Sequence, residues 1–485
     1  MMIINLSQQM QKIEKRIAIP YIVFFELVLI CRMVSIYSTL PTKIDSLFTL
    51  IIMLLSGVYF ICHFLPIFIE KKQRRIEYWL IAFIGILFLT TFINHTYAFS
   101  ENIKLIIWQC IFFFSVYEVG RSNDKSVFKA FEYVLLIVWT ALVIVGLYLF
   151  FARISFSKPV ESLYYGMRIG FFENRLYGVF VEPNYACTIS LVCILVGVRN
   201  FINTNSKWLK VVCAMVIFLQ FSYVALSGSR SGVIQLISMV IFGMFFTIWF
   251  FQKNTSKAVI KKVVQAVLVS FFCGAIVFGG LQLIEKGYIA TANSVNIEVP
   301  KVLDNKENEI LGNKKITTKR PDVEGKDDIS NSRFALWQSA IDLMKLNPIF
   351  GTSPKGFADI AKDKLPQSHI AKTAQTPHSF FFYLLAATGI SGTIVFLIFL
   401  LSKMFNSAKL LFSVRIKNYM DFVLDNQIVL VILISGLLIT EVILTRRFAT
   451  VIFWLYLGKI QYRTDMENDL IRGNEHHCSF FLLYN

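Results

Sequence analysis

Two arginines lie where apolar tracts meet polar segments, and each could bind an anion. Arg230 sits in the run Ser-Gly-Ser-Arg-Ser-Gly at 227–232, and Arg333 stands four residues before Trp337, so a helix would place that pair on one face. A guanidinium near the hydrocarbon boundary is costly unless it reaches water or meets an anion. Arg333 could stack on Trp337 or hold phosphate. Two structural alternatives stay open, namely a tight turn with one interfacial arginine and an ordinary surface arginine.

One histidine and one carboxylate occupy similar boundaries. His378 follows Thr376-Pro377 and opens an apolar run that continues to Leu401. An imidazole can titrate near neutrality and act as a general base or acid. Glu182 precedes Pro183-Asn184 near the outer end of another apolar run, where a carboxylate usually faces a cavity or an opposite charge. The alternative for His378 is a histidine whose hydrogen bonds are satisfied at the interface.

The elements that must position these residues are membrane-spanning helices. The 485-residue chain is 56% hydrophobic and only 16% charged, whereas soluble domains carry roughly 25% charged residues. Its charges cluster between apolar tracts of about 20 residues, the length that crosses a bilayer. The pattern predicts twelve spans: Ala18–Ser38, Leu47–Ile69, Tyr78–Ile93, Leu105–Val119, Phe131–Phe151, Tyr177–Val198, Trp208–Ser227, Val233–Phe251, Val263–Ile284, Ser379–Leu401, Val429–Leu444 and Phe448–Leu457.

The charges of alternate loops predict the orientation of the chain. One side receives clusters of lysine and arginine around residues 71–75, 121–129, 199–210, 253–262 and 403–417. The positive-inside rule therefore predicts that both termini are cytoplasmic. The opposite side then holds a loop at about 152–176 with Arg153, Arg168 and Arg175, the turn 227–232, and a loop of roughly 90 residues at 285–378, far longer than most connections. Arg446 and Arg447, in the last outer turn, are interpreted as topology or packing residues.

The long outer loop has two unlike halves. Residues 300–328 are crowded with Lys, Glu, Asp and Asn, a composition typical of a flexible linker. From Asn331, apolar residues recur with helical spacing, with Asn331 as the predicted N-cap and Asn347-Pro348 as the stop. We therefore expect one polytopic membrane domain over 1–485, with a loop at 285–378 that is flexible in its first half and helical in its second.

Composition and motifs disfavour several other classes. The net charge of +17 comes without a basic stripe interleaved with exposed aromatics, so we expect no nucleic-acid binding. Seven of the eight cysteines lie in apolar tracts, which indicates neither a disulfide framework nor a zinc site. A phosphate-cradling glycine loop of the Walker type and a His-Glu-x-x-His motif are both missing from the sequence.

Three segments carry a resemblance to a known family. They are Ser-Arg-Phe-Ala-Leu-Trp-Gln-Ser-Ala (332–340), Asn-Pro-Ile-Phe-Gly-Thr-Ser-Pro-Lys-Gly-Phe (347–357) and Thr-Pro-His-Ser-Phe-Phe-Phe-Tyr-Leu-Leu-Ala-Ala-Thr-Gly-Ile-Ser-Gly (376–392). Together with the turn 227–232, they resemble the O-antigen ligase/polymerase superfamily, which includes Wzy-type polysaccharide polymerases. The resemblance covers about 200 residues from Glu182 onward. Many members have an asparagine after the histidine, where this chain has Ser379.

The resemblance implies an all-α polytopic membrane protein of about twelve transmembrane helices with one large extracytoplasmic loop, a GT-C-like glycosyltransferase. Its substrate would be an oligosaccharide on undecaprenyl diphosphate in the bilayer, and a flippase and a chain-length regulator would be its protein partners. It needs no cofactor and no metal. Carried over, Arg230 and Arg333 engage the diphosphate and His378 lies near the acceptor hydroxyl, while Glu182, Arg175 and Trp337 are predicted to contact the substrate.

These expectations favour a repeat-unit polymerase for a cell-surface polysaccharide, which could be O-antigen, capsule or exopolysaccharide. A ligase that moves the finished glycan to a lipid or wall acceptor uses the same chemistry and is the nearest alternative. A polysaccharide flippase or transporter is the alternative from another class. It would be expected to place charges at the membrane midplane and to show two related halves, and the sequence shows neither.

Overall fold

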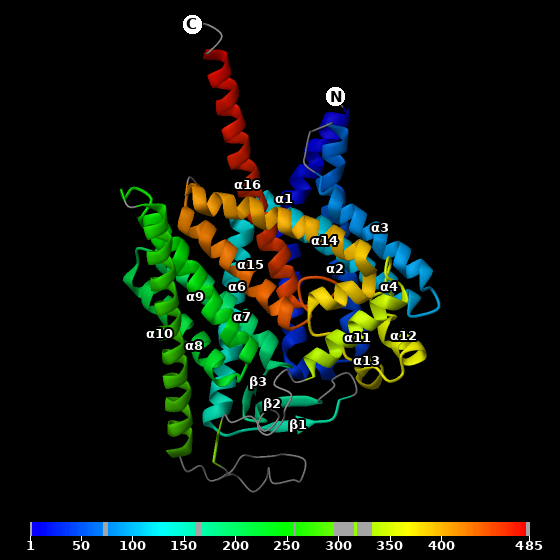
Figure 1. Cartoon of the computed structure of the whole chain (residues 1–485), viewed down its shortest axis with the longest axis vertical. Coiled ribbons are helices and arrows are strands. Elements are labelled where there is room, and N and C mark those ends of the chain that lie inside the picture. The colour runs from blue at the N-terminus through cyan, green and yellow to red at the C-terminus, as the bar shows by residue number, and fades with distance from the viewer. Residues whose placement is uncertain are drawn as a thin grey trace.

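The computed structural model describes residues 2–70, 76–160, 166–256, 258–294, 315–317, 332–414 and 416–481. These residues form an all-α polytopic fold with one small sheet (Figure 1). The helices of the first half are α1 (Met2–Met33), η1 (Ser35–Thr39), α2 (Thr42–Ile69), α3 (Tyr78–Ile93), α4 (Phe99–Ile111), the π-helical turn η2 (Phe112–Val116), α5 (Tyr117–Ser122) and α6 (Lys125–Phe151). Those of the second half are α7 (Pro183–Asn203), α8 (Lys207–Leu226), α9 (Arg230–Phe251), α10 (Val259–Ser294), α11 (Arg333–Leu346), α12 (Phe357–Lys364), α13 (His369–Thr373), α14 (Phe380–Ser413), α15 (Tyr419–Leu438) and α16 (Phe448–Phe481).

Nine helical segments within the described residues are long and apolar enough to cross a membrane, and α3 is a shorter apolar helix. The count is below twelve because α3, α1 and α16 fall outside that group. The predicted third span coincides with α3. Several predicted boundaries differ from those of the helices, and two of them have a clear structural cause. The sixth span begins at Pro183 because 175–178 belong to the sheet, and the eleventh is Tyr419–Leu438, since the chain leaves the helix after Leu438.

The outer loop at 152–176 contains structure that hydropathy did not reveal. Strands β1 (Phe156–Lys158), β2 (Met167–Phe172) and β3 (Arg175–Gly178) form an antiparallel sheet in the order β1-β2-β3. A β-bulge shifts the β2–β3 register beside Gly170, whose φ is +102°. The sheet lies at one end of the bundle, and α1 begins and α16 ends at the other (Figure 1).

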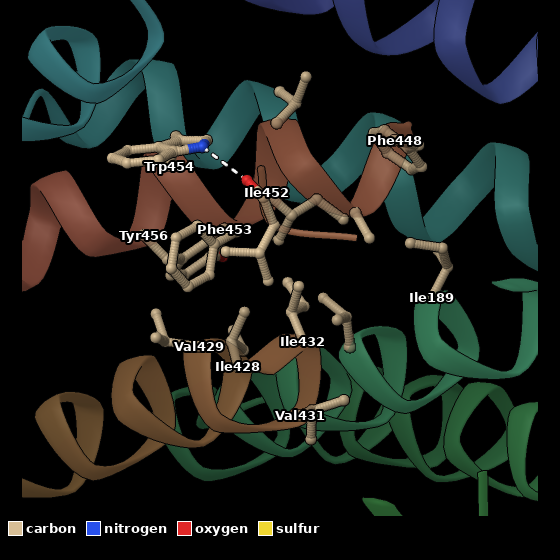
Figure 2. Packing of buried hydrophobic residues seen from close by; sticks show 14 of the residues in the cluster. Ile189, Ile428, Val429, Val431, Ile432, Phe448, Ile452, Phe453, Trp454 and Tyr456 are labelled. Atoms are coloured by element: carbon tan, nitrogen blue, oxygen red, sulfur yellow. Dashed lines mark hydrogen bonds between the residues drawn. The ribbon is translucent and has the colours of Figure 1, made fainter. Parts of the chain in front are cut away.

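Helices α15 and α16 form the centre of the core beside α7. Ile428, Val429 and Ile432 of α15 point toward α16 across a dry interface (Figure 2). The indole of Trp454 on α16 donates to the carbonyl of Val442, at 3.0 Å. This bond fixes the non-helical segment 439–447, which connects the two helices at the end of the bundle that carries the candidate site.

Buried charges on four helices form a closed network. Arg199 of α7 binds both Glu132 of α6 and Asp425 of α15, and the Lys459 ammonium of α16 lies 2.9 Å from Asp425. Tyr456 donates to Glu132 at 2.7 Å. Buried charges persist only when they are paired. The network therefore ties α6, α7, α15 and α16 together.

The predicted helix of the long loop is present as α11. It ends at Leu346, directly before Asn347-Pro348, as the sequence indicated. Ser332 holds the N-cap position, and Asn331 lies outside the described residues, as does most of the predicted linker 300–328. Within that linker, the described residue Ile316 exchanges two backbone–side-chain hydrogen bonds with Asn293 of α10. The flexible character of the linker stays a prediction.

Candidate active site

Helix α11 packs on α14 and brings Trp337 to the chain directly before His378. The indole Nε1 of Trp337 donates to the carbonyl of Pro377 at 3.0 Å. Its ring also stacks on Phe382 of α14, with centroids 4.8 Å apart. Arg333 begins the same helix, one turn before Trp337. Arg333, Trp337 and His378, which the sequence singled out separately, thus lie in one region, and Trp337 helps to orient the backbone at His378.

A break in α14 locks the preceding turn in place. Gly389 has φ +63° and ψ −162°, which interrupts the helix and frees backbone groups on both sides. The backbone of residues 348–353 binds these freed N–H and carbonyl groups through four hydrogen bonds of 2.9–3.2 Å with residues 386–391. At Gly351, whose φ is +69°, an added Cβ would lie 2.5 Å from the backbone nitrogen of Gly389. Only two facing glycines allow this approach.

His378 is half-buried and has a left-handed backbone with φ +49°. Burial, followed by the positive charges of Arg333 and Arg447, lowers its pKa to about 4. The imidazole is therefore neutral near pH 7 and can accept a proton. Two cations from different elements, α11 and the segment 439–447, act on this one ring.

The segment 439–447 contributes groups that sequence reasoning did not assign to the site. Thr440 hydrogen-bonds Thr376 hydroxyl to hydroxyl at 3.1 Å, which joins the segment to the chain before His378. Burial raises the pKa of Glu441 to about 7, although a hydrogen bond from Ser435 and the charge of Arg447 oppose the shift. Among the described residues, one oxygen of this carboxylate has no hydrogen-bond partner. A carboxyl that titrates near neutrality is a feature of functional sites.

Arg447 lies over the ring of Tyr185, 3.6 Å from its centroid. Tyr185 belongs to the first turn of α7, and it lies within electrostatic range of Glu182, Glu441 and Arg333. Arg447 therefore links the start of α7 to the region of His378. The sequence showed only a pair of outer arginines, and no spacing rule connects residue 447 to residue 185.

Arg175 and Glu182 form a second, adjoining group at the sheet and the start of α7. The buried Arg175 donates to the Ser227 carbonyl at 3.1 Å and to Asn184 Oδ1 at 2.8 Å. Its guanidinium lies 3.8 Å from Glu182, the residue whose side chain caps α7. These contacts give Arg175 and Glu182 positioning roles, and their contact with a substrate stays a prediction.

Arg230 is the first residue of α9, and its side chain is exposed. Ser229 caps the helix through Gly232 and also donates to Asn184 at 2.9 Å. Gly228 has φ +58°, and an added Cβ would lie 2.9 Å from the side chain of Arg175. The glycine-serine turn therefore places Arg230 beside the Arg175 group. The two groups adjoin through Tyr185.

The described residues contain no group of three or more His, Cys, Asp or Glu side chains arranged to hold a metal ion. The chemistry on hand is that of guanidinium groups, a neutral imidazole and a buried carboxyl. Such a set can bind an anion and accept a proton beside it.

The fold is that of a polytopic membrane protein, and the arginines, the neutral imidazole and the buried carboxyl gather at one end of its bundle. Residues 214–397 match the family described as O-Antigen ligase. The matched region runs from α8 into α14 and includes Arg230, Arg333, Trp337 and His378. The match spans 184 of the 485 residues (397 − 214 + 1) and supports a relationship to the O-antigen ligase/polymerase superfamily. It implies glycan transfer of the ligase or polymerase type by a membrane-embedded, glycosyltransferase-like enzyme that uses a lipid-linked glycan. No curated protein matches the chain.

Proposed function

We propose that this protein polymerises undecaprenyl-diphosphate-linked repeat units into a cell-surface polysaccharide at the outer leaflet of the cell membrane. Its termini are cytoplasmic, and a flippase and a chain-length regulator are its partners. One observation carries the proposal. A neutral histidine lies in the family-matched region, where Arg333 and Arg447 approach it from two different elements.

The proposed reaction is attack of an acceptor hydroxyl on the anomeric carbon, opposite the departing diphosphate. The bond from that carbon to the diphosphate oxygen breaks, and its electron pair leaves with the diphosphate. The hydroxyl proton passes to the imidazole of His378. Guanidinium forks stabilise the charge that grows on the leaving group better than a point ammonium does. Arg333, and Arg230 in the adjoining group, supply such forks, and the anomeric centre is inverted.

The positive charge around His378 links binding of the diphosphate donor to the base strength of the imidazole. In the free protein, burial and then the charges of Arg333 and Arg447 hold the pKa of His378 at about 4, so the ring is a weak base. A bound diphosphate would offset the charge of the two arginines, and the pKa would rise, while burial would still keep it below its ordinary value. The imidazole therefore becomes a stronger base when the donor is in place.

The second candidate is a ligase that transfers the finished glycan to a lipid or wall acceptor. The description of the matched family favours it. Both functions use the same groups for the same bond, so the acceptor alone separates them.

The test is the product formed by purified protein from a carrier-linked repeat unit. A ladder of products that differ by one repeat unit supports the polymerase. Transfer of a preformed chain to a second acceptor, without any ladder, would support the ligase instead. We expect His378→Ala and Arg333→Ala to lower the rate at least about 100-fold, since general base catalysis contributes 10²–10⁴-fold.

His95→Ala is the matched control. His95 is exposed, and its ring contacts only the carbonyl of Phe92 at 3.1 Å. This variant should make the same ladder as the wild type. Wild-type ladders from His378→Ala would contradict the assignment of the base.

A further inference from the structure

Three cations that lie within electrostatic range of one another, one of which acts on His378, have no ion-pair partner among the described residues. They are Lys355, in the turn after the docked segment 348–353, and Arg446 and Arg447, at the end of the segment 439–447. Lys355 is half-buried, and both arginines are exposed. We call these three residues the basic triad. Unpaired cations held close together are unfavourable unless an anion joins them.

Two carboxylates near the triad are already engaged. Glu101 pairs with Lys104 at 2.7 Å, and Asp45 pairs with Arg32 at 2.7 Å. Burial and the charge of Arg446 lower the pKa of Lys355, and Glu101 only partly opposes them. Glu441 also lies within range of Arg447, but burial raises its pKa to about 7, so this carboxyl offsets the positive charge of the triad only in part.

Aromatic rings hold both arginines of the triad from beneath. Arg446 lies 5.9 Å from the centroid of the Trp108 ring, which Arg32 also approaches at 6.0 Å. Arg447 lies 3.6 Å above Tyr185. At 3.6 Å, the Arg447 guanidinium uses its face for the contact with Tyr185, and its N–H donors remain in the plane of the group. The edge of Arg447 that could bind phosphate in a bidentate manner is therefore not used by the ring.

Rigid supports fix the backbone on each side of the triad. The backbone N–H of Lys355 donates to Asn102 Oδ1 at 2.8 Å, and its turn is docked on the break in α14. The segment that carries Arg446 and Arg447 is fixed by the Trp454–Val442 bond. A site that is built before its ligand arrives binds without a large ordering cost.

We propose that Lys355, Arg446 and Arg447 bind the diphosphate of a prenyl carrier lipid, and that they hold it as the leaving group beside His378. The identity of this leaving group rests on the proposed function. A glycosyl-linked lipid diphosphate carries two negative charges, and it gains one more when the glycosyl bond breaks and the electron pair goes to the phosphate oxygen. The triad adds three positive charges to those of Arg333 and Arg230 where this charge develops, whereas a phospholipid headgroup diester brings a single negative charge.

The test measures binding of farnesyl diphosphate, a short prenyl diphosphate, to the purified full-length chain in zwitterionic nanodiscs. We expect Arg447→Gln to weaken binding about 10-fold, since one charged hydrogen bond is worth roughly that factor. The triple variant Lys355→Gln/Arg446→Gln/Arg447→Gln should lose at least about 100-fold. Arg447→Lys keeps the charge but loses the fork, so it should bind with intermediate affinity. Lys364→Gln, which removes an exposed lysine at the end of α12 outside the triad, should bind like the wild type.

Two competitors identify the ligand chemistry. Farnesyl monophosphate should bind at least about 10-fold more weakly than the diphosphate, and phosphatidylglycerol in the nanodisc should not displace the diphosphate. Equal displacement by phosphatidylglycerol would overturn the assignment in favour of a headgroup site. Unchanged binding in the triple variant, with an unchanged thermal transition, would overturn the triad itself.

Binding and activity separate the two proposals. If the wild type binds farnesyl diphosphate through the triad and yet forms no glycan product, the proposed function fails and the triad stands. If the triple variant forms product at the wild-type rate, the triad is wrong and the proposed function stands.

Discussion

The docking of the turn 348–353 onto the break in α14 can be tested with one methyl group. In Gly389→Ala, the added Cβ would lie 2.5 Å from the carbonyl oxygen of Ile349, a distance that real Cβ atoms do not adopt. The backbone at Gly389, with φ +63° and ψ −162°, is also in a region that is essentially reserved for glycine, and an alanine there is strained by about 1–3 kcal/mol.

The magnitude follows from the two ways in which the chain can respond. If the turn stays docked, the strain and the overlap both remain. If the turn retreats, four backbone hydrogen bonds are lost at about 1 kcal/mol each. Either response should lower the free energy of unfolding by about 3–5 kcal/mol. Gly351→Ala opposes the same contact from the other side, so the double variant should cost no more than about the larger single value.

The assay is denaturant unfolding in mixed micelles, followed by tryptophan fluorescence. Gly280→Ala is the matched control, because Gly280 lies in α10 with nothing within 4 Å of an added Cβ. There the alanine should be neutral or should stabilise the helix by up to about 1 kcal/mol. Two results would contradict the docking of the turn 348–353 on the break in α14. One is a Gly389→Ala protein whose unfolding free energy lies within about 1 kcal/mol of the wild type. The other is a double variant whose loss of unfolding free energy equals the sum of the two single losses.

Three further predictions concern the site. Arg333→Gln should raise the pKa of His378 from about 4 toward 6.5, because a like charge is removed; an NMR titration of labelled histidines measures this, and an unchanged pKa would contradict it. Trp337→Phe removes the bond to Pro377 but keeps an aromatic ring, so kcat should fall about 5- to 10-fold with KM little changed; a wild-type kcat would show that His378 needs no such support. The pKa of Glu441 is raised to about 7, so the folded protein loses stability as pH rises above about 4.5, most fully above pH 7. Glu441→Gln should therefore raise the unfolding free energy at pH 8 and change it little at pH 4, and equal effects at both pH values would argue against a buried neutral carboxyl.

Hydropathy and local sequence pattern were sufficient to predict the long apolar helices of this fold and the helix after residue 331. The third predicted span matches α3, and the amphipathic stripe after residue 331 is α11. Both signals are local, since about 20 apolar residues or one helical period can be recognised without any partner. The boundaries failed where a tertiary contact decided them. Residues 175–178 left the predicted sixth span because they pair with β2.

The contacts between distant elements could not be predicted in the same way. Arg447 and Tyr185 are 262 positions apart (447 − 185), and nothing near either residue indicates that one stacks on the other. Arg199 was counted with the loop charges and Asp425 lay outside the predicted eleventh span, and only the packing of three helices brings both of them together with Glu132. For the same reason, Arg446 and Arg447 of the basic triad were first interpreted as topology or packing residues. A positive residue near a span end serves either purpose until its partners are known.

The motifs that carry the family resemblance contain two kinds of residue. Some hold the turn 348–353 and α11 against α14, and others supply reactive groups. Gly351 and Gly389 exist for the close approach of two backbones, and Pro377 presents a carbonyl to Trp337 while offering no competing N–H. These residues would be needed even if no reaction took place, because they hold α11 and its turn against α14. His378, by contrast, has a left-handed backbone, and two cations add to the effect of burial in lowering its pKa; packing requires neither the backbone strain nor the two cations. His378 keeps this strain and this nearby charge although many contacts stabilise the structure around it. Such a combination indicates the residue on which the chemistry depends.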